Sequence, residues 1–377
     1  MNTFFLRHGM IVIADSFFVN AYWLRVITDT TMPPHKKNKP VRKRDWKPED
    51  WDTASRQNRS RREENAPQDT RAAADYFSGV TANALVVSPY GVLAFVQWND
   101  DEVLCRVDDV LVDGKSSVLA PGDQVLVERD KDDAVIVAVR PRRNKLSRPD
   151  IGRDREQVFA ANIDYAVVVA SVAKPMFNTG LIDRYLVAAQ AGGVTPVICL
   201  NKIDLAETEP ESVQQYRELG VQVIATSCET VAGIDQLRAL LSGKLSVLTG
   251  NSGVGKSSLV NALDPDFDID TQEVSESTKK GRHTTTTSRM YALSGDIRII
   301  DTPGIRQLGL WGVTPAELNY FFPDLAQYSP MCKFRDCTHT HEPKCAVRDA
   351  VEQGQIGRAR YASYVRIRTS LTEDSQS

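Results

Sequence analysis

Eight residues in the middle of the chain have the types and spacing of a phosphate-binding loop. They follow an apolar run typical of a buried strand, residues 245–249, and open a segment of helical periodicity, residues 257–263. Glycines let such a loop turn its backbone N–H groups inward, around phosphate oxygens. The alternative is a glycine-rich turn that matches the pattern by chance. The strand before the loop and the helix after it favour a nucleoside triphosphate site instead. The eight residues are Gly250, Asn251, Ser252, Gly253, Val254, Gly255, Lys256 and Ser257.

The last residues of this P-loop carry side chains that suit phosphates and Mg²⁺. Lys256 is expected to reach the terminal phosphates, and the Ser257 hydroxyl is expected to bind Mg²⁺. Ser258 follows at the start of the helix, whose N-terminus adds a partial positive charge. We therefore include Ser258 among the predicted nucleotide-binding residues.

A second motif, N-K-x-D, follows another apolar run, residues 195–200. The Asp204 carboxylate can accept two N–H bonds from the edge of guanine, Asn201 can contact the purine ring, and the Lys202 stem can lie along the base. A later run ends in Ser227 and Cys228, which are placed to offer backbone N–H groups to the guanine carbonyl. A surface turn would also tolerate N-K-x-D. Together with a P-loop in the same sheet, the motif predicts selection of guanine.

A third motif, D-x-x-G, follows the apolar run 297–300. Asp301 is expected to hold Mg²⁺ through water, and the Gly304 N–H to contact the terminal phosphate. The polar stretch between the P-loop and this motif contains four consecutive threonines, and a Mg²⁺ ligand is expected there. Thr285 and Thr286 are the candidates.

The motifs stand in an unusual order, because the base-recognition elements precede the P-loop and D-x-x-G comes last. This order predicts a circularly permuted GTPase domain, whose last switch leads directly into the C-terminal segment. Ile305 occupies the position where many GTPases have a water-orienting Gln. His283, beside the threonines, is the nearest ionisable candidate to orient the attacking water, and a solvent-exposed bystander is the alternative.

A cluster of soft ligands lies near the C-terminus in the pattern C-x₄-C-x-H-x₅-C. Three thiolates and one imidazole suit tetrahedral Zn²⁺, and the absence of a suggested fifth ligand or general base favours a closed structural site. His341 competes with His339 for the fourth position. The predicted set is Cys332, Cys337, His339 and Cys345.

The region before the nucleotide motifs reads as a small barrel. Five short alternating runs, separated by turn residues, occupy 80–88, 91–98, 102–107, 123–128 and 134–140. They predict a small antiparallel barrel of the OB-fold type, a class that often binds single-stranded nucleic acid. Tyr90, Phe95 and Trp98 could stack on bases or belong to the core. The basic stretch 140–145 is either a solvated linker or part of an RNA-facing surface.

The middle of the chain alternates between strand and helix patterns. Strands are expected at 165–171, 195–200, 221–226, 245–249, 289–293 and 296–300, and helices at 180–191, 211–219 and 233–241. Such alternation predicts a parallel, doubly wound sheet with ligands at the carboxyl ends of its strands. Residues 347–368 are helical in pattern. They carry four arginines that could face phosphates or solvent, Arg358, Arg360, Arg366 and Arg368.

Length and composition support a multidomain protein of ordinary globular type. The 377 residues are 42% hydrophobic and 25% charged, with a net charge of −3. Residues 32–62 are strongly basic, which suggests either a polyanionic partner or a solvated, disordered tail. The apolar stretch 11–27 is too short and too interrupted for a membrane span. Residues 1–31 are therefore expected to lie outside the fold, with a poorly anchored amphipathic segment as the alternative, and no membrane partner is expected. Three of the six cysteines are scattered, which fits a reducing cytoplasm.

Taken together, the barrel and these motifs in this order resemble the RsgA (YjeQ) family of ribosome-small-subunit-dependent GTPases, over roughly residues 79–370. The resemblance implies an OB-fold barrel at 76–145, a circularly permuted GTPase domain at 155–311 and a zinc-binding helical domain at 312–377. The basic extension 1–75, expected to be disordered, lies outside the resemblance and inherits nothing from it.

The resemblance further implies a factor in late assembly of the small ribosomal subunit. It would bind that subunit and its rRNA, carry Mg²⁺ with GTP and one structural Zn²⁺, and act as a cytoplasmic monomer. It implies that hydrolysis of GTP to GDP is stimulated by the subunit, that His283 is catalytic, and that His339 rather than His341 binds zinc. The alternative is an RNA-binding module that needs GTP binding but hardly hydrolysis.

Overall fold

The computed structural model describes residues 81–113, 116–130, 133–149, 156–267, 288–301 and 309–374. All of them belong to one unit of the chain, residues 67–377. Several sequence predictions fall outside the described residues. These are the disordered extension 1–75, the catalytic His283, the Mg²⁺ ligands Thr285 and Thr286, and Gly304.

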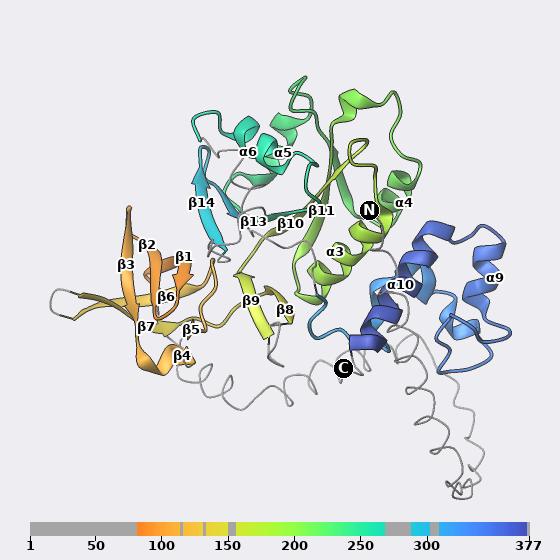
Figure 1. Cartoon of the computed structure of the whole chain (residues 1–377), viewed down its shortest axis with the longest axis horizontal. Coiled ribbons are helices and arrows are strands. Elements are labelled where there is room, and N and C mark those ends of the chain that lie inside the picture. The colour runs from red at the N-terminus through yellow and green to blue at the C-terminus, as the bar shows by residue number, and fades with distance from the viewer. Residues whose placement is uncertain are drawn as a thin grey trace, which may run out of the picture. The chain divides into compact units, whose positions relative to one another are not determined.

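The first described part is a closed five-stranded barrel, drawn in orange and yellow in Figure 1. Its strand order, β1-β2-β3-β7-β6, places the third and fifth strands side by side in parallel, as in an OB-fold. Alternate residues such as Val86, Val96 and Ile136 are buried inside it. The prediction of five strands is therefore confirmed. The strands are β1 (Ala84–Tyr90), β2 (Leu93–Trp98), β3 (Asp101–Val107), β6 (Gln124–Asp130) and β7 (Asp133–Val139); a short helix η1 (Asp109–Leu111) and a ribbon of β4 (Val112–Asp113) and β5 (Ser116–Ser117) connect β3 to β6.

The second part is a six-stranded sheet in the order β12-β11-β10-β13-β15-β14. Five strands are parallel, as predicted, and β14 is an antiparallel edge strand. The central strands are almost wholly buried, as expected for a parallel sheet covered on both faces. The strands are β10 (Tyr165–Ser171), β11 (Thr195–Asn201), β12 (Gln222–Ala225), β13 (Leu245–Thr249), β14 (Arg289–Leu293) and β15 (Ile297–Asp301).

Helices cover both faces of this sheet and create two separate cores. Successive residues of β10 point to opposite faces, so Val168 packs with α3 whereas Val167 packs with α5 and α6. Residues of α3 and Tyr216 of α4 share the first core. The helices are α3 (Thr179–Ala191), the short η2 (Ile203–Leu205), α4 (Ser212–Glu218), α5 (Ile234–Leu241) and α6 (Lys256–Leu263).

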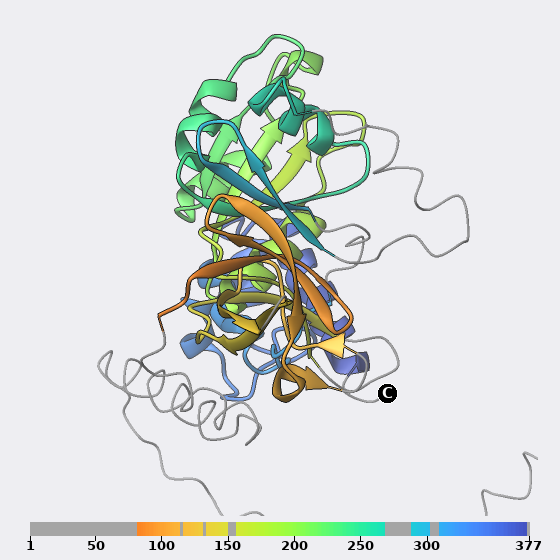
Figure 2. The ribbon, with the colours of Figure 1, turned by 90° about the vertical axis from the view of Figure 1, so that its left-hand side faces the viewer.

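A hairpin that the sequence did not predict joins the barrel to the sheet. It consists of β8 (Lys145–Pro149) and β9 (Glu156–Ala161), which pair antiparallel with a register shift after Leu146. Its apolar residues Leu146 and Phe159 enter the core beneath α3. The barrel also contacts β14, which lies beside β1 in Figures 1 and 2, and Ser88 Oγ donates to the Ser288 carbonyl at 3.2 Å.

The C-terminal part is helical, and its last segment differs from the prediction. We expected one helical segment at 347–368, but the structure has two helices, because Gly354 takes a φ of +75° after the first one ends. The elements are η3 (Leu318–Phe321), α8 (Pro323–Ala326), η4 (Ser329–Met331), α9 (Ala346–Glu352) and α10 (Arg358–Asp374). Across the ranges the structure describes, we find no helix with the length and apolar character needed to cross a bilayer.

Gly122 lies where the barrel meets the hairpin, and substituting it tests the close packing at this junction. Its φ is +90°, and a Cβ there would lie 2.1 Å from the Ala161 carbonyl oxygen. Gly295 also has a positive φ, +75°, but has nothing within 4 Å of the same position. We expect Gly295→Ala to lower the free energy of unfolding by about 1–2 kcal/mol, the cost of a left-handed conformation. Gly122→Ala should lower it further in urea titrations, and equal losses in the two variants would contradict the close packing at Ala161.

Candidate nucleotide site and metal cluster

The predicted nucleotide motifs meet at one edge of the sheet. The P-loop follows β13, and the N-K-x-D motif begins at Asn201, the last residue of β11. Both strands pair in parallel with β10, so their carboxyl ends lie on either side of it. This edge is where ligands bind in open α/β sheets.

Two side chains of the N-K-x-D motif bridge directly to the P-loop. Asn201, which is buried, donates from Nδ2 to the Val254 carbonyl at 2.9 Å. Lys202 donates from Nζ to the Gly253 carbonyl at 2.5 Å. Gly255 is needed for this approach, because a Cβ there would lie 2.4 Å from Asn201 Nδ2. The base-recognition and phosphate-binding segments therefore form one unit.

The remaining predicted base residues lie beside this bridge. Ser227 donates from Oγ to Asp204 Oδ1 at 2.5 Å, which holds the carboxylate against the loop after β12. The Cys228 thiol lies 3.9 Å from Asn201 Oδ1. Burial raises the pKa of this thiol, so it is a neutral part of the site at physiological pH. The structure thus brings all five predicted base residues together.

Three of the predicted phosphate and Mg²⁺ groups line a common cavity. Lys256, Ser257 and Asp301 all contribute to its wall, next to Tyr291. Lys256 donates from Nζ to the carbonyls of two P-loop residues, each at 2.9 Å. The other predicted loop residues vary in burial: Gly250, Asn251 and Gly255 are half-buried, Val254 is buried, and Ser252, Gly253 and Ser258 are exposed.

The sequence prediction missed residues that follow β10. The Lys174 carbonyl accepts a second bond from Lys202 Nζ at 2.7 Å, and Pro175 lies against Gly253. A signal for them was present, because residues 165–171 form a predicted buried strand whose carboxyl end must reach the same edge.

The four predicted zinc ligands form one cluster. Their ligand atoms all lie within 4.8 Å of one another. The Cys332 and Cys345 sulfurs are 3.8 Å apart, and His339 Nδ1 lies 3.6 and 3.5 Å from them. Tetrahedral bonds of about 2.3 Å to zinc place sulfur ligands about 3.8 Å apart, so the set fits this ion. Burial, and then neighbouring thiols, raise the pKa of Cys337 to about 12, so a metal must displace its proton.

The structure also distinguishes the two histidines. His339 is buried, and its Nε2 lies 3.1 Å from Ser329 Oγ, which directs Nδ1 toward the sulfurs. His341 is exposed, and its Nδ1 contacts the neighbouring Thr340 hydroxyl at 3.0 Å. His339 is therefore the histidine that fits the metal set.

Comparison with known proteins agrees with this geometry. The family model described as RsgA GTPase matches residues 139–311. The small ribosomal subunit biogenesis GTPase RsgA of Actinobacillus succinogenes is 40% identical over 306 residues, covering 78% of this chain and 86% of that protein. The chain belongs to the RsgA GTPase family. The RsgA of Chlorobaculum tepidum is also 40% identical, over 308 residues that cover 78% of this chain and 99% of that relative.

Solved structures of RsgA-type proteins match the same extent of the chain. The crystal structure of YjeQ from Thermotoga maritima has a TM-score of 0.59 and 30% identity, covering 77% of this chain and 98% of that one. YloQ, described as a circularly permuted GTPase, has a TM-score of 0.57 and 28% identity, covering 77% and 95%. The predicted permutation, with the base-recognition strands before the P-loop strand, is confirmed.

The metal cluster gives a direct test. We expect the purified protein to contain about one Zn²⁺ per chain, because three thiolates and one imidazole complete a closed tetrahedral site. Cys345→Ala should lose the metal, whereas the matched control His341→Ala should keep it, as measured by elemental analysis. A protein without zinc, or metal loss in His341→Ala equal to that in His339→Ala, would overturn the assignment.

Proposed function

We propose that this chain is a GTPase that acts in late maturation of the small ribosomal subunit. It binds the subunit and its rRNA in the GTP form and leaves after subunit-stimulated hydrolysis. The observation that carries the proposal is the bridge from Asn201 and Lys202 to the P-loop, which joins guanine selection to phosphate binding. The proposed partner, the small ribosomal subunit, is inferred from relatives that are named small ribosomal subunit biogenesis GTPase.

In this proposal guanine lies between the N-K-x-D loop and the loop after β12. Asp204 accepts the two N–H bonds of the base edge, Asn201 contacts the ring, and the Lys202 stem lies along the base. The backbone of Ser227 and Cys228 faces the guanine carbonyl. The short Ser227–Asp204 bond supports this arrangement, because it orients the carboxylate before the base arrives.

The phosphates are held by the P-loop, residues 250–257, and by Ser258 at the start of α6. A triphosphate offers Lys256 charge-assisted bonds that are stronger than those to its present carbonyl partners. Mg²⁺ is bound by Ser257 and Asp301, whose shared cavity supports the assignment, together with Thr285 or Thr286. Magnesium would neutralise the charge that develops on the transferred phosphate.

Hydrolysis is assigned to His283, and the phosphate-dependent switch to Gly304. Both assignments rest on the motifs and on the RsgA resemblance. Ile305 follows Gly304 and has no group that could orient water. His283 orients the attacking water, the role of glutamine in other GTPases.

The other parts of the chain serve the encounter with the subunit. The barrel, residues 76–145, presents the exposed Tyr90 at the turn between β1 and β2 as a candidate stacking group. One structural Zn²⁺ stabilises the helical segment 312–377, and the GTPase domain spans 155–311. We propose that the protein acts in the cytoplasm as a monomer, without membrane association.

The guanine assignment predicts a change of base preference. Asp204→Asn replaces one acceptor by a donor, so guanine loses a charged hydrogen bond and xanthine gains a partner. We expect GDP affinity to fall by about 10- to 100-fold, the loss typical of a hydrogen bond to a charged group. Titration with fluorescent GDP and XDP measures this, with Asp235→Asn, an exposed residue of α5, as the matched control. Unchanged GDP affinity would refute the placement of the base.

The catalytic assignment predicts a loss of turnover without a loss of binding. His283→Ala should reduce subunit-stimulated turnover by about 10²–10³-fold, the range for one positioned general base. GTP affinity should barely change, because the P-loop and Mg²⁺ hold the phosphates. Ser257→Ala should instead weaken Mg²⁺-dependent nucleotide binding itself.

Single-turnover hydrolysis and co-sedimentation with isolated subunits distinguish a GTPase from an RNA-binding module that needs GTP binding but hardly hydrolysis. The His283→Ala protein should stay on small subunits in its GTP form and should not sediment with large subunits. Normal turnover in this variant would remove the role of the histidine. Release without hydrolysis would favour the RNA-binding module instead.

A further inference from the structure

Helix α3 contacts the P-loop region on one side and the C-terminal helix α10 on the other. Its apolar residues Ile182 and Leu186 belong to the core beneath the sheet. Asp183 and Val187, one turn apart on another face, are both buried, and Val187 packs in the core of the C-terminal part. One rigid element therefore touches both the nucleotide domain and the C-terminal helices.

Asp183 joins three helices through a single carboxylate. It is fully buried, and its Oδ1 accepts from Arg360 Nη1 of α10 at 2.5 Å and from the Tyr216 hydroxyl of α4 at 2.9 Å. Its Oδ2 is buried and has no hydrogen-bond partner among the described residues. Burial raises the pKa of Asp183, and Arg360 opposes that rise. The Ser363 and Tyr216 hydroxyls oppose the rise as well, so contacts from α10 and α4 together favour the charged carboxylate.

Arg360 is held from the other side as well. It is 6% exposed, donates from Nε to Asp324 of α8 at 3.1 Å, and stacks 4.1 Å from the centre of the Phe322 ring. The sequence predicts that Arg360 faces either phosphates or solvent. In the structure it faces neither. Separating a buried pair leaves an uncompensated charge, so α10 cannot shift without moving α3 or losing this contact.

Further contacts fix α10 against the same helices. Arg184, the next residue of α3, donates from Nη1 to Ser370 Oγ at 3.0 Å. Near the start of α10, Gly357 lies so close to Gln215 of α4 that a Cβ there would be 2.6 Å from the Gln215 amide nitrogen. Helix α10 is therefore held along much of its length.

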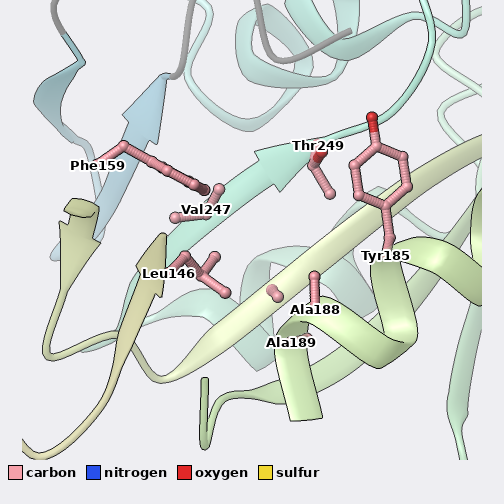
Figure 3. Close-up of a pocket in the computed structure, with 8 residues that line it drawn as sticks. Leu146, Phe159, Tyr185, Ala188, Ala189, Val247 and Thr249 are labelled. Atoms are coloured by element: carbon pink, nitrogen blue, oxygen red, sulfur yellow. The ribbon is translucent and has the colours of Figure 1, made fainter. Parts of the chain in front are cut away.

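Tyr185 extends from the opposite side of α3 to the start of the P-loop. Figure 3 shows its ring beside Thr249, with the hydroxyl next to the chain where β13 ends. Tyr185 is 3% exposed, and its hydroxyl lies next to the Thr249 hydroxyl and the Gly250 backbone, which offset part of the rise that burial causes in its pKa. Tyr185 and Thr249 line one small cavity, and Thr249 Oγ1 is buried, so the two hydroxyls are polar neighbours in an otherwise apolar space.

The position of Gly250 depends on close packing. A Cβ there would lie 2.2 Å from the Val169 carbonyl of β10, so the P-loop begins in a tightly bounded space. Residues two apart on a helix point to nearly opposite sides. Asp183 and Tyr185 therefore connect α10 to the first residue of the P-loop through less than one helical turn.

We propose that Tyr185 and Asp183 are positioning residues for the nucleotide site, through which α10 of the C-terminal part sets the geometry of the P-loop. This proposal rests on the proposed GTPase function. A partner that displaces α10 changes nucleotide affinity, and by thermodynamic reciprocity the nucleotide changes the stability of α10.

The first test is Tyr185→Phe, which removes one hydroxyl and keeps the ring in the core. We expect GDP and GTP to bind about three- to tenfold more weakly, the loss typical of one hydrogen bond. KM should rise by the same factor while kcat stays unchanged, because ground state and transition state lose the same contact. The matched control is Tyr165→Phe, a half-buried tyrosine at the amino end of β10 and away from the P-loop, which should change nucleotide affinity less. Wild-type affinity in Tyr185→Phe overturns the proposal.

The second test compares two buried carboxylates that each pair with an arginine. Asp183→Asn should weaken GDP binding about three- to tenfold, as for one hydrogen bond. Asp123→Asn, which breaks the 2.7 Å pair between the buried Asp123 and the half-buried Arg142 of the barrel, should lower the melting temperature without this loss. The double variant Asp183→Asn/Tyr185→Phe should be less than additive, because both changes act on one path. Equal affinity in the two Asn variants, or full additivity, overturns the coupling.

Hydrogen exchange supplies a readout that a purely structural role would not change. In the wild type, GDP should slow exchange in α10, and Asp183→Asn should abolish that effect. Absence of a GDP effect on α10 in the wild type refutes the coupling. If Asp183→Asn does not fold, Tyr216→Phe, which removes a bond to the same carboxylate, replaces it in this measurement. A wild type that binds no guanine nucleotide would refute the proposed function itself, a result distinct from all of these.

Discussion

The candidate site depends on one constraint, namely that β10 separates the two strands that carry its motifs. The segments after β11 and β13 must reach across the end of β10 to meet. They do so through side-chain-to-backbone bonds, from Asn201 to the Val254 carbonyl and from Lys202 to the Gly253 carbonyl. The absence of a side chain at Gly255 makes room for the first of these.

Strand pairing, not chain order, satisfies this constraint. The sheet order β12-β11-β10-β13-β15-β14 places the base-recognition strands on one side of the P-loop strand and the D-x-x-G strand on the other. The chain can therefore begin at a different strand without disturbing the site. A consequence of this order is that Asp301, at the end of β15, lines the same cavity as Ser257 while the chain continues from it toward the C-terminal helices.

Much of the fold could be predicted because its strands carry strong patterns. The strand Leu245–Thr249 and the strand Arg289–Leu293 have the predicted bounds, since buried strands read as apolar runs and edge strands alternate. The hairpin β8–β9 could not be predicted. Its strands are short, a register shift interrupts their alternation, and Lys145 and Arg148 resemble linker residues. The nucleotide motifs were predictable because each is contiguous, whereas Pro175 and Tyr185 reach the P-loop only through tertiary packing.

Local composition could not reveal the partners of charged residues. The basic stretch 140–145 was expected to be a linker or an RNA-facing surface, yet Arg142, Arg143 and Lys145 pair with Asp123, Asp164 and Glu156. These partners are far apart in sequence, so only the folded chain identifies them. The aromatic residues of the barrel show the same limit: Phe95 packs against the core of the sheet, and Arg129 lies over Trp98.

Helix α10 shows how such hidden contacts link distant sites. On one side it holds the backbone of the metal cluster, because the Tyr361 hydroxyl donates to the His339 carbonyl at 2.7 Å and the Tyr364 hydroxyl to the Thr338 carbonyl at 3.3 Å. On the other side it inserts Arg360 toward Asp183. A buried ion pair contributes little net stability, because desolvation offsets its attraction, but it is costly to break from one side. Such a pair therefore defines the relative position of the elements it joins more than it stabilises the fold, and here it holds the helices around the Cys₃His cluster in register with the nucleotide domain.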